Sequence, residues 1–392
     1  MPGDAERLFE LTERLVRLST VTGEAGDGLS ELERFLEKAG VPTDRLRVPN
    51  LEPVLVAGAP PRPDRPTLLL ATHLDTVPIA GEASRPMGTV EEGKLYGRGA
   101  LDMKSGLALS LLLMQEFRDD PRFNLGFVAT TDEEAESAGA WALLDHLPVP
   151  PDLVLVPEPT WEKVALSASG RVVWQASFEG KGGHGQGIRT RPAPNPLLAL
   201  GSLLSGLPRD YTPLKAWTQG EGEVTLPHAS HVRLDRLLSP GASVEADRTA
   251  LQSRVRTIAR HFPGLEGTVN LAPRSTPWLP AYSTDPKDPL VRVLLGSLAK
   301  NGGAPRTIHE EAVGDFNIFG SQFPTVIYGP AGDGAHGDDE WVDLISLERC
   351  WRAYRRFLVS FPDAVPARRE PPTEGTERAS RARRDRARKK KG

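Results

Sequence analysis

The chain has 392 residues, of which 39% are hydrophobic and 26% charged, a balance that allows a large apolar core and excludes a largely disordered chain. Its glycines and prolines follow no triplet period, which excludes collagen. Cys350 is the only cysteine, so an internal disulfide, a cysteine-based zinc finger and a CxxC redox pair are excluded. The longest apolar run, Leu107 to Met114, is too short to cross a bilayer, and the acidic N-terminus lacks the basic flank of a secretory signal. We therefore expect a cytoplasmic protein that does not bind membranes.

Charge is distributed unevenly along the chain. The net charge is −4, but residues 367–392 carry eight Arg, three Lys and four acidic residues, a local charge of +7 that leaves −11 on residues 1–366. An acidic body argues against a nucleic-acid-binding fold. Residues 366–392 contain no large apolar residue, so we predict a disordered, solvated basic tail. We do not expect the protein to bind nucleic acid, except weakly through this tail.

The first part of the chain predicts an α/β layer. Apolar stripes indicate one helix that begins at Asp4 and a second that ends at Gly40. Strands and helices then alternate, with strands at 66–72, 125–130 and 153–156 and helices at 104–117 and 137–147. Alternation at this spacing is typical of a parallel sheet flanked by helices.

The α/β pattern of the first part of the chain is interrupted near Val172 and resumes later in the sequence. Strands at 172–178, 231–238 and 268–272 alternate with helices at 196–207 and 244–262, as in a small α+β unit, and the α/β pattern returns with a helix at 290–300, a strand at 324–328 and a helix at 347–358. We predict a large α/β domain of residues 1–172 and 283–365, with a mixed, mostly parallel central sheet flanked by helices. A small α+β domain is inserted at residues 173–282.

Acidic residues and histidines follow the predicted strands, where ligand sites of open α/β sheets collect. Two imidazoles and three carboxylates without a thiol suit a pair of zinc ions that share one carboxylate, although Co²⁺ or Mn²⁺ could occupy the same ligands. The five segments are His73-Leu74-Asp75, Asp102, Glu133-Glu134, Glu158 and His336.

Neighbouring acids in these segments are expected to take different roles. His73 and Asp75 lie two residues apart on an extended chain and face the same side, so Asp75 is expected to hold the outer N–H of His73. Glu133 and Glu134 are adjacent and cannot point the same way. One is expected to bind metal while the other faces the water that attacks the substrate, as a hydrolase requires.

Four of these motifs closely resemble the dinuclear zinc hydrolases that comprise acetylornithine deacetylase, succinyl-diaminopimelate desuccinylase, aminoacylase and glutamate carboxypeptidase. The resemblance runs in matching order from about Leu8 to Phe361 and leaves the basic tail outside. The motifs are ATHLDTVP at 71–78, YGRGALDMKSG at 96–106, TDEE at 131–134 and PEP at 157–159.

The resemblance implies a role for each site residue and for the inserted unit. The inserted unit would be a ferredoxin-like lid and dimerisation domain, and Glu158 fits the deacylase and carboxypeptidase branches better than the aminopeptidase branch. The implied residues are His73, Asp102 and Glu158 on one zinc; Asp102, Glu134 and His336 on the other; Glu133 as general base; Asp75 behind His73; His184 reaching across a homodimer to polarise the scissile carbonyl; and Arg236 and Asp315 at the substrate.

Several functions compete for this sequence. The leading prediction is metal-dependent hydrolysis of the amide bond of N-acyl amino acids, and the runner-up is carboxypeptidase or dipeptidase action. A non-catalytic scaffold whose basic tail binds RNA is the alternative of another class. The GxGxxG match at 180–185 is rejected as a dinucleotide site because three prolines follow where the phosphate-binding helix should begin, and no GxSxG elbow of a serine hydrolase is present.

Overall fold

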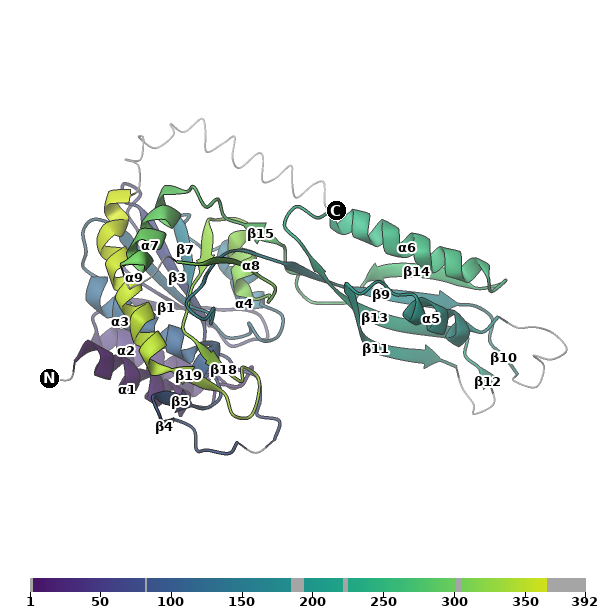
Figure 1. Ribbon diagram of the computed structural model, residues 1–392, viewed down its shortest axis with the longest axis horizontal. Coiled ribbons are helices and arrows are strands. Elements are labelled where there is room, and N and C mark those ends of the chain that lie inside the picture. Colours follow the sequence, from purple (N-terminus) through teal and green to yellow (C-terminus); the bar gives the residue numbers. More distant parts are fainter. Residues whose placement is uncertain (1–2, 82, 185–193, 221–224, 301–304, 365–392) are drawn as a thin grey trace.

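The computed structural model describes residues 3–81, 83–184, 194–220, 225–300 and 305–364, which form two lobes (Figure 1). The larger lobe is built on a nine-stranded sheet. Its strands are β1 (Thr43–Leu46), β2 (Val54–Ala57), β3 (Thr67–His73), β6 (Asn124–Thr130), β7 (Leu153–Val156), β8 (Val164–Ala168), β15 (Tyr282–Ser283), β16 (Thr307–Glu310) and β17 (Thr325–Ile327).

The strand order is β1-β2-β6-β3-β7-β17-β8-β15, and β16 also pairs with β8. The central pairs β6–β3, β3–β7 and β7–β17 are parallel, as is β8–β16. The remaining pairs, β1–β2, β2–β6, β17–β8 and β8–β15, are antiparallel. The sheet is therefore mixed, as predicted, with its parallel strands in the middle.

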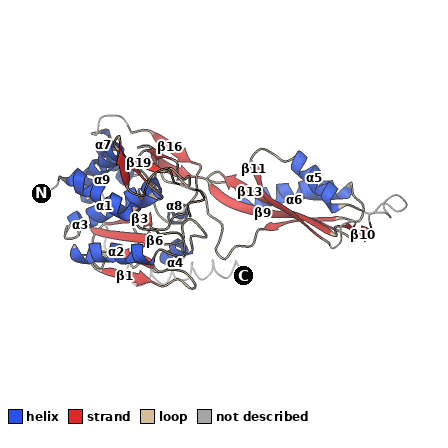
Figure 2. Cartoon of the chain, turned by 90° about the horizontal axis from the view of Figure 1, so that it is seen from below, coloured by secondary structure: helices blue, strands red, loops and turns tan. Residues whose placement is uncertain are grey.

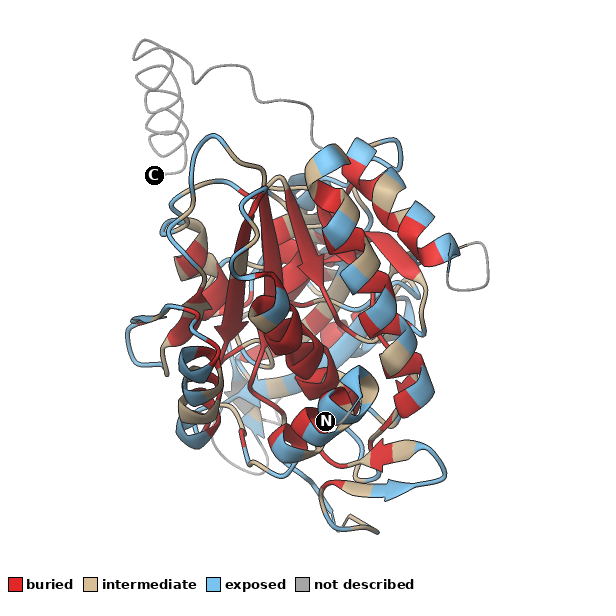
Figure 3. Cartoon of the chain, turned by 90° about the vertical axis from the view of Figure 1, so that its left-hand side faces the viewer, coloured by how far each residue is buried: buried red, intermediate tan, exposed pale blue. Residues whose placement is uncertain are grey.

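Helices cover both faces of this sheet, which Figure 3 shows buried between them. Leu68 and Leu70 of β3 belong to one apolar core, and Leu69 and Ala71 belong to the other, because alternate side chains point to opposite faces. One face packs against α1 (Asp4–Val16), α2 (Gly26–Lys38), α3 (Ser105–Phe117), α7 (Pro289–Ala299) and α9 (Leu344–Ala364), and the other against α4 (Ala138–Leu144) and α8 (Asp315–Gly320).

The helix predicted over 137–147 is shorter in the structure, where α4 ends at Leu144. The chain continues as a turn in which the backbone N–H of His146 donates to the carbonyl of Leu143. Pro148 follows, and a residue that precedes proline is disfavoured in the helical conformation. The apolar stripe therefore extends beyond the helix itself.

A small sheet that the sequence did not predict lies beside the large one. Its order is β18-β19-β5-β4, so it joins a segment near residue 95 to a segment near residue 340. This pairing places two distant loops at the same edge of the molecule. The strands are β4 (Thr89–Glu91), β5 (Lys94–Tyr96), β18 (Gly332–Asp333) and β19 (Trp341–Asp343).

The smaller lobe consists of a four-stranded antiparallel sheet with α5 (Pro196–Ser205) and α6 (Val244–Arg260) packed on one face (Figure 2). Trp174 and Phe178 lie in the core between the sheet and these helices. The strands are β9 (Gly170–Glu179), β11 (Tyr211–Gln219), β13 (Ala229–Leu238) and β14 (Glu266–Leu271), in the order β11-β13-β9-β14. A further short pair joins β10 (Gly183–His184) to β12 (Thr225–Leu226). The domain boundaries at residues 173 and 282 and the role as a lid remain predictions.

Within the described residues, no helix combines the length and apolar character that crossing a membrane requires.

Candidate active site

Three neighbouring parallel strands bring the expected acids and one histidine to the same edge of the large sheet. His73 is the last residue of β3, Glu133 follows the end of β6, and Glu158 follows the end of β7. Because these strands run in the same direction, their carboxyl ends meet. The predicted convergence of these segments is present in the fold.

The first group of potential metal ligands surrounds His73. Its Nε2 lies 3.1 Å from Oδ1 of Asp102 and 3.2 Å from Oε1 of Glu158. The other ring nitrogen, Nδ1, lies 2.9 Å from the backbone carbonyl oxygen of Asp75 and 3.6 Å from its carboxylate. The carbonyl of Asp75 therefore holds the outer nitrogen of the ring, at the residue where the sequence placed this support.

The carboxylate of Asp75 also holds the loop that follows β6. It is fully buried and accepts hydrogen bonds from the backbone N–H groups of Glu133 and Glu134, both at 3.2 Å, and from the Thr22 hydroxyl at 2.8 Å. Asp75 thus fixes the loop that carries both glutamates relative to His73.

The second group of potential ligands surrounds His336. Its Nε2 lies 3.0 Å from Oε2 of Glu134 and 3.3 Å from Oδ2 of Asp102. Asp102 presents Oδ1 to the His73 group and Oδ2 to the His336 group. This arrangement is that of a carboxylate that bridges two cations.

The donor set fits two divalent cations. In each group the histidine Nε2 lies 3.0 to 3.3 Å from the carboxylate oxygens, and all the potential ligand atoms of the group lie within 4.8 Å of one another, close enough to share one cation. Burial, reinforced by the charge of Asp102, raises the pKa of Glu158 to about 7. Burial also raises the pKa of Glu133 well above its usual value. Buried carboxylates held this close need compensating positive charge, which two divalent cations would supply.

The side chain of Glu133 does not join either group, unlike that of Glu134. Its neighbour across the loop is Gly314, where an added Cβ would overlap Oε1 of Glu133. The absence of a side chain at Gly314 therefore leaves room for this carboxylate. The geometry agrees with the expectation that the two adjacent glutamates point in different directions.

Glu340 is a site residue that the sequence analysis missed. It is almost fully buried, and its carboxylate accepts hydrogen bonds from Arg98 Nη1 at 2.7 Å and from the backbone N–H groups of Gly99, Leu101 and Asp102 at 2.9 to 3.0 Å. It therefore holds the turn that presents Asp102. The available signal was only an acid four residues after His336, which by itself is too common to interpret.

Two other expected site residues, Asp315 and Arg236, have partners within the protein. Asp315 is buried and accepts a hydrogen bond from the Thr130 hydroxyl at 2.6 Å, and burial raises its pKa to about 7. Arg236 pairs with Asp210 at 2.6 Å and Asp247 at 3.0 Å, both in the smaller lobe. Neither side chain is part of the two potential ligand groups. Their roles at the substrate remain predictions.

His184 is described only in its backbone, which belongs to β10. Its side chain, like the basic tail at 366–392, lies outside the described residues.

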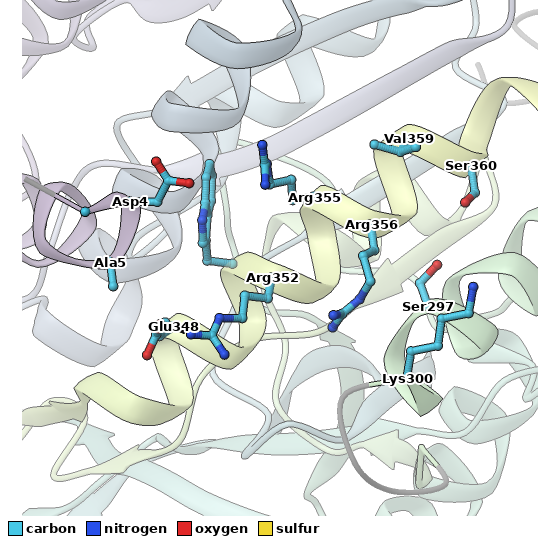
Figure 4. A pocket seen from close by; sticks show the side chains of 12 residues that line it. Asp4, Ala5, Ser297, Lys300, Glu348, Arg352, Arg355, Arg356, Val359 and Ser360 are labelled. Atoms are coloured by element: carbon cyan, nitrogen blue, oxygen red, sulfur yellow. Dashed lines mark hydrogen bonds and ion pairs between the residues drawn. The ribbon is translucent and has the colours of Figure 1, made fainter.

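A cavity of about 790 Å³ elsewhere on the larger lobe does not coincide with this site. It lies between α7, α9 and the start of α1, and Figure 4 shows Arg352, Arg355 and Arg356 along it. None of the potential metal ligands lines it. Arg355 pairs with Glu116 at 2.6 Å, and Arg352 pairs with Glu348. The chemistry is therefore expected at the strand ends and not in this cavity.

The chain is similar in sequence and in fold to known hydrolases. The chain is 26% identical over 382 residues to succinyl-diaminopimelate desuccinylase of Caulobacter vibrioides, a match that covers 90% of this chain and 96% of that protein. Among solved structures, it resembles a tripeptidase from Staphylococcus aureus, with a TM-score of 0.77, 19% identity and coverage of 92% and 99% of the two chains. It also resembles a dinuclear metal-binding peptidase of the M20 family from Bacillus subtilis, with a TM-score of 0.73, 16% identity and the same coverage.

Residues 69–360 match peptidase family M20/M25/M40, which is metal-dependent. The match extends from β3, which carries His73, into α9 and therefore includes every potential metal ligand named above. The chain is a hydrolytic enzyme that belongs to peptidase family M20/M25/M40.

Proposed function

We propose that this enzyme hydrolyses the amide bond of N-acyl amino acids and releases the free amino acid. The observation that carries the proposal is Asp102, which offers one carboxylate oxygen to each of two ligand groups beside the unliganded carboxylate of Glu133. The relative from Caulobacter vibrioides is named a desuccinylase, which favours removal of an acyl group.

Two zinc ions would be held by the two groups, with His73, Asp102 and Glu158 around one and Asp102, Glu134 and His336 around the other. When bound, such cations act as Lewis acids that lower the pKa of water and polarise the amide carbonyl. His and carboxylate donors without sulfur suit zinc, and they also suit Co²⁺ or Mn²⁺.

Glu133 would act as the general base. Its carboxylate takes a proton from the attacking water and later delivers that proton to the nitrogen of the leaving amine. Burial raises the pKa of the Glu133 carboxyl group. The hydrogen bonds from the backbone N–H groups of Glu133 and Glu134 to Asp75 hold the loop that carries this carboxylate.

The active enzyme would be a homodimer in which His184 of one protomer polarises the scissile carbonyl in its partner. The strand β11 supports this proposal because it forms an edge of its sheet and pairs on one side only among the described residues. Leu214 of this strand is 50% exposed. A long exposed edge strand is a surface on which another chain can add.

Substrate profiling tests the proposed activity. The zinc-loaded protein is assayed with N-acetyl and N-succinyl amino acids and with dipeptides, and we expect the N-acyl amino acids to be hydrolysed fastest. Exclusive hydrolysis of dipeptides would establish the dipeptidase alternative instead. An inactive protein that binds no zinc but binds RNA in a salt-sensitive manner would favour the scaffold.

A further inference from the structure

Arg274 lies on the segment that leads from β14 back to the larger lobe. The two residues that follow it attach this segment to the loop after β6, because the N–H of Ser275 donates to the Glu136 carboxylate at 3.1 Å and the Thr276 hydroxyl donates to the Glu136 carbonyl at 2.6 Å. Glu136 is three residues beyond Glu133. Arg274 therefore stands at the junction of the two lobes, next to the loop that carries the proposed general base.

The guanidinium of Arg274 is half-buried and forms no ion pair with any residue that the structure describes. Its Nε is buried without a hydrogen-bond acceptor, and within the described ranges it forms no ion pair. It lies over the ring of Trp278, with 5.0 Å from the guanidinium carbon to the ring centre. Burial lowers its pKa even though the carboxylates of Glu136, Asp132 and Asp315 attract the positive charge. Burying a cation without a direct partner costs free energy, which a bound anion would offset.

Two arginines of the smaller lobe, Arg171 and Arg236, differ from Arg274 because they pair with carboxylates. Arg171 forms a two-bond contact with the carboxylate of Asp235, at 2.8 and 3.1 Å. Arg236, which the family resemblance implies as the carboxylate-binding residue, contacts Asp210 and Asp247. Both guanidinium groups therefore already have anionic partners, whereas that of Arg274 retains N–H donors for a ligand.

We infer that Arg274 binds a carboxylate of the substrate, an inference that rests on the proposed function. A guanidinium offers paired N–H donors whose spacing matches a carboxylate, and it stays charged at any physiological pH. The carboxylates of Glu136, Asp132 and Asp315 near Arg274 would repel an anionic substrate, and the guanidinium beside them offsets that repulsion. The substrate class is then an N-acyl amino acid with a free carboxylate, either on the α-carbon or at the end of a succinyl chain.

Four substrates distinguish the two positions of the carboxylate. They are an N-acetyl amino acid, the same compound as its α-carboxamide, the N-succinyl amino acid and its α-carboxamide. The values of kcat and KM are measured for the wild type and for Arg274→Gln and Arg274→Lys. Arg171→Gln serves as the matched control because it removes a nearby cation that already has a partner, and Arg236→Gln tests the competing assignment.

We expect Arg274→Gln to raise KM by about 10-fold to 100-fold for substrates that carry the recognised carboxylate, the range of a charged hydrogen bond. The matching uncharged substrate should change less than about 3-fold, well below that range, and Arg274→Lys should recover part of the loss. A loss confined to the two substrates with a free α-carboxylate, and absent from their α-carboxamides, identifies the α-carboxylate. A loss confined to the two succinyl compounds identifies the carboxylate of the acyl chain. Equal losses on all four substrates, or a selective loss only in Arg236→Gln, would overturn the inference.

A binding measurement separates this inference from the proposed activity. Calorimetry of the same four compounds with Glu133→Gln and with the double variant Glu133→Gln/Arg274→Gln reports affinity without turnover. If the wild type hydrolyses none of the compounds but Arg274 still confers carboxylate-selective binding, the proposed activity fails and the inference stands. Affinity that does not depend on Arg274 refutes the inference even in an active enzyme.

Discussion

Glu340 supports the backbone of Asp102, because its Oε1 accepts a hydrogen bond from the backbone N–H of Asp102 at 3.0 Å. Both residues lie beside the small sheet. The residues are 238 positions apart in the chain. The pairing of β5 with β19 is what brings them together, and it places the proposed bridging carboxylate between His73 and His336.

Replacement of Glu340 should weaken cation binding. In Glu340→Gln, the amide NH₂ faces backbone N–H groups that need an acceptor, so the turn at Asp102 loses part of its support. We expect zinc affinity to fall about 10-fold to 100-fold, as for other groups that orient a ligand. Competition titration against a chelator measures the change. The control is Glu348→Gln, which removes an exposed partner of Arg352; equal zinc affinity in the two variants would contradict the assigned role.

Replacement of the proposed general base should separate metal binding from turnover. Glu133→Gln keeps both ligand groups intact, because neither includes Glu133, and it removes only the group that takes the proton. We expect full zinc content with kcat lowered about 10²-fold to 10⁴-fold. Elemental analysis and steady-state kinetics provide the two readouts, with Glu162→Gln as the control. Unchanged turnover would refute the role of Glu133.

Removal of the cations should lower both activity and thermal stability. Without them the buried carboxylates near His73 and His336 lose their compensating charge. Free zinc at 100 times its dissociation constant should stabilise the fold by about 2.7 kcal/mol through binding alone. Melting curves with chelator, and again after zinc is added back, measure the effect. Identical melting temperatures in the two conditions would argue against a cation bound at these residues.

The space at Gly314 should matter for catalysis and not for folding. In Gly314→Ala the new methyl group pushes against the Glu133 carboxylate, and a displacement of about 1 Å can cost roughly 100-fold in rate. Gly296→Ala in α7 is the control, since an added Cβ there meets nothing within 4 Å and should stabilise the helix by about 0.5–1 kcal/mol. Urea unfolding and kcat are measured for both variants. Full activity in Gly314→Ala would show that the carboxylate moves without consequence.

Charge on the exposed edge strand should disrupt the proposed dimer. Leu214→Glu places a carboxylate on β11, so two such strands would repel each other across a shared interface. Sedimentation should show a dimer for the wild type and a monomer for this variant. Val359→Glu on α9 replaces a residue of similar exposure, 51%, and should remain a dimer. A monomeric wild type, or a dimer that persists in Leu214→Glu, would contradict the proposal.

Local patterns in the sequence predicted the elements whose burial is either complete or periodic. All seven residues of β3 are buried, so its apolar run predicts a strand covered on both faces, and α1 shows its apolar stripe at helical spacing. The strand β11 was not predicted, because most of its residues are exposed and its sequence shows no alternation of apolar and polar residues. Exposure of both faces, as at this sheet edge, leaves no periodic signal in the sequence.

The sequence by itself determined the ligand types: two histidines and a set of acids without cysteine, placed where strands end. Only the tertiary structure decided which oxygen of Asp102 faces which histidine and that Glu340 supports Asp102. It also decided that Arg274 has no ion-pair partner among the described residues, whereas Arg236 has two. The physical reason is that hydrogen bonds and ion pairs depend on distances between atoms. Atoms from segments far apart in the chain come to 3.0–3.3 Å from one another only after the sheets have paired.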